Sequence, residues 1–154
     1  MMDIRTATGS DASRLAHLSG VLGYPVSSDA MDQRLQRVLA RAEDVIFVAD
    51  TPATGIVGWI HGAERDTLES DLRCEILGLV VDPKYRNQGV GRRLVAAIET
   101  WAAARRLEEV AVRSNITRVE AHPFYERMGY VRVKTSHIYR KPVSRQVADA
   151  RRSG

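Results

Sequence analysis

A basic segment with two glycines separates an apolar run from a helical pattern. It reads VVDPKYRNQGVGRRLV, covers residues 80–95 and contains Gly89 and Gly91. Glycines let the backbone approach a ligand closely, and the free amides and dipole at a helix start favour an anion. Arg86 and Arg92 can add charge-assisted hydrogen bonds. The segment predicts a diphosphate site, with an ordinary turn carrying solubilising arginines as the alternative.

Two common phosphate loops do not fit this segment. A Rossmann loop needs a small residue where Leu94 stands, and leucine would block the close approach of helix and strand. A Walker A loop needs the string G-x-x-x-x-G-K-S/T, which does not occur in the chain. The residues from Arg86 to Gly91 instead fill the pattern R/Q-x-x-G-x-G/A.

This pattern and its surroundings resemble the GNAT superfamily of acyl-CoA-dependent N-acetyltransferases. The resemblance rests on CEILGLVVDPKYRNQGVGRRLV at 74–95, on Asn115 and on AHPFYERMGY at 121–130. It implies acetyl-CoA as cosubstrate, with its pyrophosphate on the loop amides and its pantetheine paired to the preceding strand like an added strand. For Asn115 it implies a hydrogen bond to pantetheine, and a turn residue is the alternative. The implied cofactor-binding residues are Leu79, Val80, Val81, Arg86, Asn87, Gln88, Gly89, Val90, Gly91, Arg92 and Asn115.

Acetyl transfer to an amine requires a base, because an ammonium with a pKa of about 10 has no lone pair. Glu75 is the candidate: it lies in an apolar strand, where partial burial makes a carboxylate a better proton acceptor. The resemblance implies the same role, since some GNAT enzymes carry a catalytic glutamate at this place. Glu64 and Asp66 are lesser candidates. A structural carboxylate paired with Arg73 or Arg113 is the alternative.

The candidate acid is Tyr125. The resemblance implies that this tyrosine donates a proton towards the CoA sulfur. A phenol with a pKa of about 10 can protonate a thiolate whose conjugate acid has a pKa of about 8.5. A core tyrosine is the alternative. Pro123 is tolerated only in a first helical turn, so the helix that carries Tyr125 should begin near residues 120–122.

No metal is expected. Cys74 is adjacent to Glu75 on a strand and should point to the opposite face, buried and inert. None of the four histidines has the spacing of a metal ligand. They are His17, His61, His122 and His137.

The elements that must position these residues form a mixed sheet with helices, of the α/β (α+β mixed sheet) class. Their predicted order is β-α-α-β-β-β-α-β-α-β-β, the order of the GNAT acyl-CoA N-acyltransferase fold. Ser10 and Ser28 are predicted to cap the first two helices. A helix is expected after the glycines, and a short one should end at Met128 with Gly129 as its C′ residue. Strands are predicted at 3–8, 45–50, 55–64, 72–82, 108–114, 130–134 and 136–141.

Gly78 interrupts the fourth predicted strand. A glycine inside a strand often marks a bulge, and packing is the alternative reason for it. A bulge there would splay this strand from its parallel neighbour, the fifth strand, which is joined to it by a right-handed crossover. Unpaired amides would then face a cleft between the two strands.

Composition and charge predict one domain at 1–141 and a basic, disordered tail at 142–154. Residues 140–154 carry five basic side chains and one acidic one, which accounts for the formal net charge of +4. The rest is neutral on balance, so no nucleic-acid partner is expected. The N-terminus lacks a signal-like apolar region, no apolar run is long enough for a membrane span, and there is one cysteine. A cytoplasmic protein without a membrane partner is expected, and a homodimer is plausible for this fold.

We interpret the chain as an acetyl-CoA-dependent N-acetyltransferase acting on a primary amine of a small molecule by direct attack in a ternary complex. In this fold the acceptor is recognised largely by the first two helices, the loop between them and the later strands. Here the loop, GYPVSSD at 23–29, offers Tyr24 and few charges. A small amine or amino-acid-like acceptor is favoured. A protein acetyltransferase acting on N-termini or lysines, and a non-catalytic CoA-binding sensor, are the alternatives.

Overall fold

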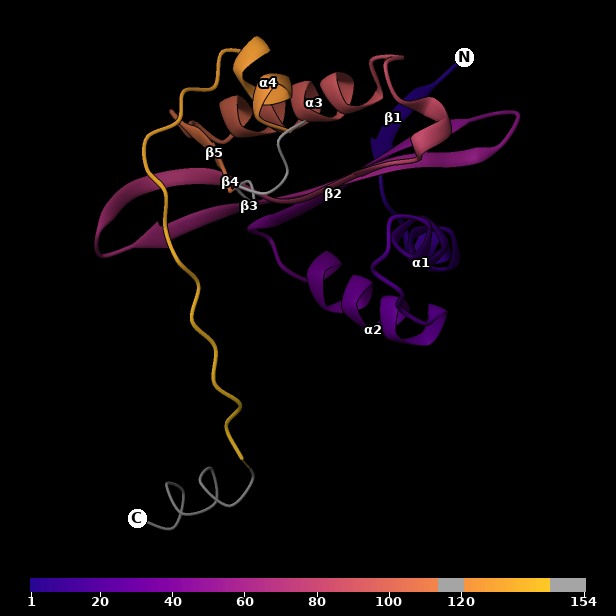
Figure 1. Cartoon of the computed structure of the whole chain (residues 1–154), viewed down its shortest axis with the longest axis horizontal. Coiled ribbons are helices and arrows are strands. Elements are labelled where there is room, and N and C mark those ends of the chain that lie inside the picture. The colour runs from indigo at the N-terminus through magenta and orange to yellow at the C-terminus, as the bar shows by residue number, and fades with distance from the viewer. Residues whose placement is uncertain (114–120, 145–154) are drawn as a thin grey trace. The chain divides into compact units, whose positions relative to one another are not determined.

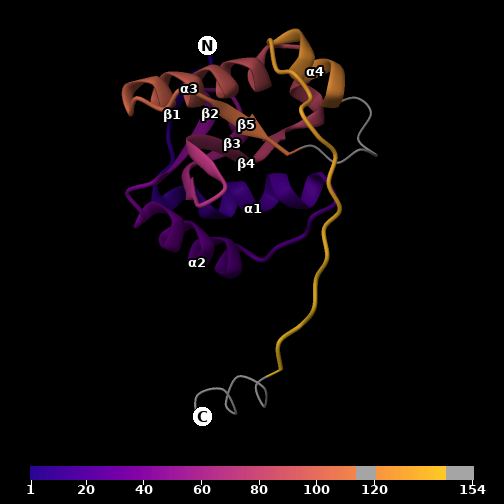
Figure 2. The ribbon, with the colours of Figure 1, turned by 90° about the vertical axis from the view of Figure 1, so that its left-hand side faces the viewer.

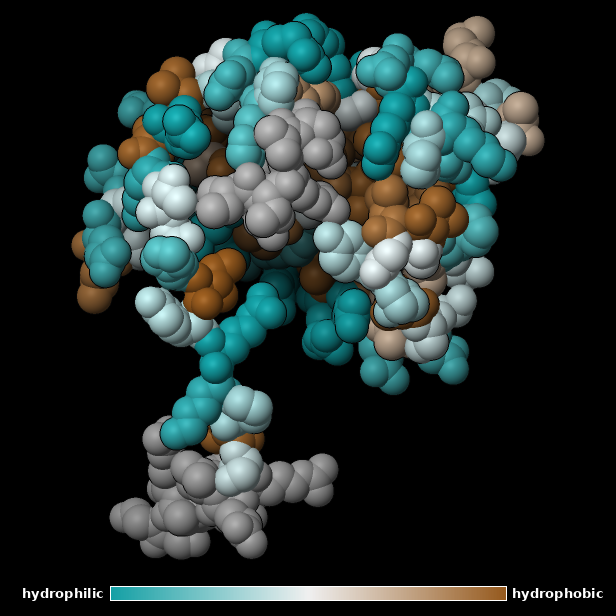
Figure 3. Space-filling view, viewed as in Figure 1, coloured by the Kyte–Doolittle hydropathy of each residue, from teal (hydrophilic) through white to brown (hydrophobic). Residues whose placement is uncertain are grey.

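The computed structural model describes residues 1–113 and 121–144 of the 154-residue chain. They belong to two compact units, Met1–Arg113 and Ser114–Gly154. Within the described ranges, no helix combines the length and the apolar character that crossing a membrane requires. Hydrophilic side chains cover much of the face shown in Figure 3, with separate hydrophobic patches between them. The predicted single domain at 1–141 and its tail stay a prediction.

A five-stranded mixed sheet forms the centre of the first unit (Figure 1). The strands lie in the order β1-β2-β3-β4-β5, antiparallel from β1 to β4 and parallel between β4 and β5. This arrangement confirms the predicted mixed sheet and its parallel pair. The elements are β1 (Asp3–Thr6), η1 (Gly9–Asp11), α1 (Ala12–Val21), α2 (Ser28–Leu39), β2 (Asp44–Thr51), β3 (Gly55–Thr67), β4 (Ser70–Val81), η2 (Pro83–Tyr85), α3 (Val90–Ala104) and β5 (Val110–Val112).

Helices cover both faces of this sheet: α1 and α2 lie on one face and α3 on the other (Figures 1 and 2). Leu15 and Leu18 of α1 and Leu35 of α2 are nearly inaccessible to solvent. They join Ile46 and Val48 of β2 in one hydrophobic cluster. Burial of these aliphatic side chains is the main favourable term that holds the two helices on the sheet.

Two glycines on β3 let α3 approach the other face closely. A Cβ added to Gly58 would lie 3.0 Å from the Val80 carbonyl oxygen and 3.0 Å from Val90 Cγ1. One added to Gly62 would lie 2.6 Å from Ile98 Cδ1. Because Val90 and Ile98 lie on one stripe of α3, the two missing side chains seat this helix and place its N-terminus beside the end of β4.

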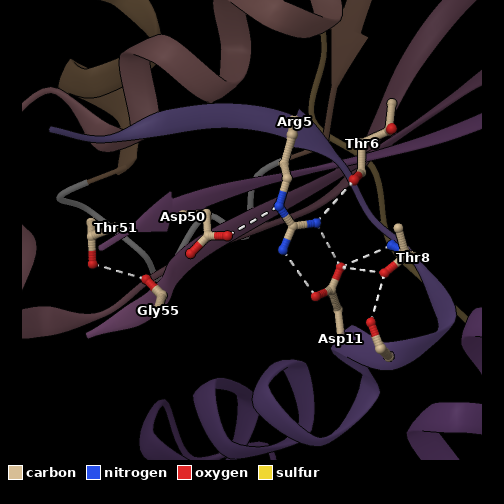
Figure 4. Close-up of polar contacts among 8 residues, drawn as sticks. Arg5, Thr6, Thr8, Asp11, Asp50, Thr51 and Gly55 are labelled. Carbon is tan, nitrogen blue, oxygen red and sulfur yellow. Dashed lines mark hydrogen bonds and ion pairs between the residues drawn. The ribbon is translucent and has the colours of Figure 1, made fainter. Parts of the chain in front are cut away.

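An ion-pair network ties the start of α1 to the sheet (Figure 4). Arg5 of β1 donates from Nη1 and Nη2 to the two Asp11 carboxylate oxygens at 2.9 and 3.0 Å, and from Nε to Asp50 at 3.1 Å. The Thr8 amide donates to Asp11 at 2.8 Å. The arginine hydrogen bonds hold the pKa of Asp11 below its usual value, and they raise that of Arg5.

The predicted caps are misplaced by one or two residues. Thr8 is the N-cap of η1, which leads into α1, so Ser10 lies inside this turn and its prediction as the cap is wrong. Ser27 caps α2 by accepting from the Ala30 amide at 3.0 Å, so the prediction for Ser28 is also wrong. Adjacent serines have equal capping chemistry, and the direction from which the chain enters the helix selects between them.

The second unit contains α4 (Ala121–Arg127). Gly129 follows it with φ 92°, as predicted for a C′ glycine. The strands predicted at 130–134 and 136–141 are wrong: residues 130–144 contain no strand. Their alternating apolar residues give strand propensity, but a strand exists only when another strand pairs with it, and here Val131, Val133 and Ile138 are exposed.

The close approach at Gly58 predicts a stability difference between two alanine variants. Gly58→Ala should lower the free energy of unfolding by about 1–3 kcal/mol, because the methyl group would press on the β4 backbone and on α3. Gly20→Ala is the control. Gly20 is exposed on α1, an added Cβ would meet no described atom within 4 Å apart from its chain neighbours and the nearby helix backbone, and alanine there should stabilise by up to about 1 kcal/mol. Urea unfolding measures both, and a neutral Gly58→Ala would contradict the proposed packing.

The lowered pKa of Asp11 predicts a pH dependence of stability. Such a carboxyl contributes fully above its unfolded pKa of about 4, and its contribution is lost as the pH falls through the lower folded value. Asp11→Asn should cost roughly 2 kcal/mol near neutral pH and flatten the loss of stability below pH about 4. Asp3→Asn, on the exposed end of β1, is the control. Parallel acid-unfolding profiles for Asp11→Asn and wild type would disprove the linkage.

Candidate active site

A β-bulge in β4 marks the centre of the candidate site. His61 of β3 pairs with Gly78, but the next residue, Gly62, pairs with Ile76, so Leu77 is the extra residue. The predicted bulge is therefore present, one residue before Gly78. A Cβ on Gly78 would lie 3.0 Å from Cζ3 of Trp59, so packing also favours a glycine here.

Strand β4 loses its second neighbour at this bulge. It pairs with β5 through three residues, ending where Ile76 lies opposite Val112. It then continues to Val81, and within residues 1–113 its only strand partner over this stretch is β3. Backbone groups of 77–81 that point away from β3 are thus available to an added extended ligand. Pairing of pantetheine with Leu79, Val80 and Val81 would need this free edge, and it stays a prediction.

The glycine loop leads from this strand into α3. Asn87 and Gly89 adopt positive φ values of 63° and 79°, and the N-cap of α3 is Gly89, which has no side chain to cap the helix. The first helical hydrogen bond runs from the Arg93 amide to the Gly89 carbonyl at 3.0 Å. The amides of the preceding first turn therefore have no acceptor within the helix. They belong to Val90, Gly91 and Arg92.

The loop is held where it leaves β4 and is positively charged. Buried Asp82 accepts from the Lys84 amide at 3.0 Å, and Tyr85 hydrogen-bonds Thr54 at 2.7 Å. Arg86 and Arg92 are exposed. Exposed guanidinium groups beside unpaired helix amides form a site suited to an anion such as a diphosphate.

Glu75 lies on the sheet face that α1 and α2 cover, on β4 just before the bulge. Its residue is 7% exposed, and its carboxylate lies 3.6 Å from Arg65 Nε and 3.2 Å from Arg113 Nε. The sequence predicted Arg113 as one of two possible partners of Glu75 if this carboxylate has a structural role. These positive charges balance a buried carboxylate. The base role and the structural role are therefore compatible, and the base role stays a prediction.

The lesser candidate bases lie elsewhere. Glu64 pairs in register with Cys74 and binds Arg105, the C-cap residue of α3, at 2.6 Å, so it faces α3, away from Glu75. Asp66 is exposed near the end of β3. Neither shares the environment of Glu75.

Two further groups were missed by sequence reasoning. Nε2 of His61 lies 2.7 Å from Asp44, and its ring is on the same sheet face as Glu75. Nε1 of Trp59 is buried and has no hydrogen-bond partner in the part of the chain that the structure describes. Strand alternation could have placed both beside Glu75, but the pairing with Asp44 depends on the register between β2 and β3.

Cys74 is inert in this environment. It is fully buried, and burial raises the pKa of its thiol to about 11, so the thiol stays protonated at neutral pH. Its residue faces away from Glu75, as predicted from the alternation of strand side chains. Among the described residues, no three His, Cys, Asp or Glu side chains gather to hold a metal ion. The expectation of a metal-free reaction stays a prediction.

The two predicted site residues beyond Arg113 are Asn115 and Tyr125, and neither lies in the described part of the first unit. Asn115 lies outside the described residues. Tyr125 is half-buried in α4 of the second unit, with its ring 5.0 Å from Phe124 and 5.9 Å from Tyr130. Helix α4 begins at Ala121, within the range that Pro123 predicted. The acid role of Tyr125 and the ligand role of Asn115 stay predictions.

Comparison with known proteins agrees with this geometry. The Acetyltransferase (GNAT) family matches residues 13–130. Aminoglycoside N(6')-acetyltransferase type 1 from Stenotrophomonas maltophilia is 28% identical over 144 residues, covering 91% of this chain and 93% of that protein. The crystal structure of aminoglycoside 6'-N-acetyltransferase AAC(6')-Ih from Acinetobacter baumannii superposes with a TM-score of 0.81 at 20% identity, covering 94% and 100% of the two chains.

A second solved structure, of AAC(6')-Iy in complex with CoA, gives a TM-score of 0.82 at 21% identity, covering 93% of this chain and 96% of that one. At these identities the structural likeness establishes the fold. The family match spans most of the chain, including the glycine loop and the helix that carries Tyr125. The chain therefore belongs to the acetyltransferase (GNAT) family and is an acetyl-CoA-dependent N-acetyltransferase.

Proposed function

We propose that this enzyme acetylates a primary amine of a small molecule by direct attack in a ternary complex. The observation that carries the proposal is the sequence of features along one strand. Strand β4 offers Glu75, then the bulge, then a backbone edge without a second strand, and then the positively charged loop that opens α3. An extended nucleotide thioester fits this series from its acyl end to its diphosphate.

The cosubstrate would be held mainly through the main chain. The amides from Gln88 to Arg92 would bind the pyrophosphate, with Arg86 and Arg92 adding charge. Leu79, Val80 and Val81 would pair with pantetheine along the free edge of β4. The unpaired first-turn amides support this assignment, because they need an acceptor from outside the helix. Asn115 would supply a further hydrogen bond to pantetheine.

Two side chains of this enzyme would act as the base and the acid of the reaction. Acetyl-CoA supplies an activated acyl thioester. Glu75 would take a proton from the acceptor's ammonium, leaving a neutral amine that can attack. Tyr125 would return a proton to the departing thiolate. The attacking nitrogen would lose its second proton as the amide forms, and the phenolate left on Tyr125 would take it up. Each product is then neutral at the reacting atom, and no covalent enzyme intermediate is needed.

Small-molecule acceptors are favoured by the relatives. The matched Stenotrophomonas maltophilia protein is named as an aminoglycoside N(6')-acetyltransferase and aligns over 91% of this chain. A panel of primary amines with acetyl-CoA, read by release of free thiol, tests the proposal. It should include aminoglycosides, short amino acids and an N-terminal peptide. Release with the peptide alone would favour a protein acetyltransferase instead.

The assignment of the diphosphate site predicts a binding defect without a folding defect. Arg92→Glu reverses a charge in the first turn of α3, where a carboxylate favours the helix. It should weaken CoA binding about ten- to hundredfold in calorimetry, because a charge-assisted contact is lost and a repulsion is gained. Arg34→Glu makes the same charge change on the exposed side of α2 and is the control. Unchanged affinity in Arg92→Glu would exclude this loop as the site.

The assignment of Glu75 predicts a defect that depends on pH. Glu75→Gln should lower kcat/KM about a hundredfold near pH 7 while CoA binding is retained. The loss should shrink as the pH approaches about 10, where the amine deprotonates without a base. Tyr125→Phe is the comparison, because loss of an acid is not relieved by raising the pH. A Glu75→Gln defect of constant size at every pH would indicate a structural role only.

A further inference from the structure

We infer that the acceptor carries an anionic group, a carboxylate or a phosphate, which binds in an arginine-lined pocket beside Glu75. The inference rests on the proposed function and concerns the acceptor side of the same site. The pocket belongs to the first unit and lies at the ends of β3, β4 and β5. Its lining residues are Arg65, Thr67, Arg73, Glu75 and Arg113.

The pocket holds more positive charge than is needed to balance the Glu75 carboxylate. Three arginines face one carboxylate, which leaves two positive charges among the lining residues. Arg65 and Arg113 contact the two carboxylate oxygens of Glu75. The side chain of Arg73 is half-buried and makes no hydrogen bond or ion pair among the described residues, and its Nε atom is buried without a partner there. A buried charged donor without an acceptor is costly unless a ligand satisfies it.

The register between β3 and β4 brings two of these positive charges close together. Arg65 lies directly opposite Arg73 in the β3–β4 pair. Like charges at directly opposed positions destabilise a sheet. An anion between the two guanidinium groups would turn this repulsion into attraction, and the planar fork of arginine suits carboxylate and phosphate oxygens. The pair is thus better explained as a binding site than as a device for stability.

The position of the pocket sets the shape of the acceptor. Arg73 precedes Glu75 by two residues on β4, which is about 7 Å along the strand on the same face. An amine at Glu75 and an anion at Arg73 would therefore belong to one compact molecule, such as an amino acid. Aminoglycosides carry several amino groups, and their positive charge opposes this pocket.

The test compares amines that differ only in their second group. Glycine, β-alanine and 4-aminobutyrate are each assayed beside the corresponding amide, with 3-aminopropylphosphonate and 1,4-diaminobutane as further arms. At one chain length or more, the anionic acceptor should exceed its amide at least about tenfold in kcat/KM. The phosphonate arm distinguishes phosphate from carboxylate recognition. Amides or diamine equal to the anionic acceptors at every length would overturn the inference while leaving the proposed function intact.

Two variants localise the effect. Arg73→Gln should lower kcat/KM about tenfold for the anionic acceptor, mainly through KM, and leave its amide unchanged. Arg106→Gln, in the exposed turn after α3 and away from the acceptor side of the sheet, should change neither. Equal losses for acid and amide in Arg73→Gln would indicate a structural defect and overturn the assignment.

Binding gives a readout that does not need turnover. Calorimetry titrates 4-aminobutyrate and 4-aminobutanamide into the CoA-saturated enzyme and its Arg73→Gln variant. Preference for the acid that disappears in Arg73→Gln supports the pocket even if no amine in the panel releases thiol, an outcome that would contradict only the proposed function. Equal or absent binding of both compounds to the wild type, together with no anion preference in turnover, overturns the inference.

Discussion

The change in the number of partners along β4 organises this enzyme. The strand has neighbours on both sides up to Ile76 and keeps only β3 beyond the bulge at Leu77, within residues 1–113. Backbone amides and carbonyls need partners when water is excluded, so a sheet that stops pairing in its interior leaves a site for an extended ligand. Glu75 lies on β4, the arginine-lined pocket lies beside it, and the positively charged glycine loop follows the end of this strand.

Close packing on the α3 face fixes the far end of this strand. Gly58 and Gly62 bring α3 against β3, and Asp82 and Tyr85 hold the turn that connects β4 to the glycine loop. The unpaired amides at the start of α3 are therefore placed by the core and not by the loop itself. A rigid helix start is useful because a preorganised anion site loses little entropy on binding.

Positive charge is concentrated in two places along β4. A positive loop follows β4, and a positive pocket surrounds Glu75 before the bulge. Glu75 is a buried carboxylate balanced by Arg65 and Arg113, while the buried Nε of Arg73 has no acceptor within residues 1–113 and 121–144. The overall charge of +4 conveys none of this, because the local excess of arginine depends on which strands are neighbours.

The sequence alone predicted the mixed sheet and the glycine loop and indicated a bulge near Gly78, because local spacing and glycine chemistry specify them, whereas the burial of Glu75 was one of two alternatives that it left open. It misplaced two helix caps and predicted strands over 130–141 that the structure lacks, because a strand requires a partner that alternation cannot supply. Only the tertiary structure set Arg65 opposite Arg73 and Arg113 beside Glu75. Such contacts join strands far apart in the chain, and their register follows from packing of the whole sheet.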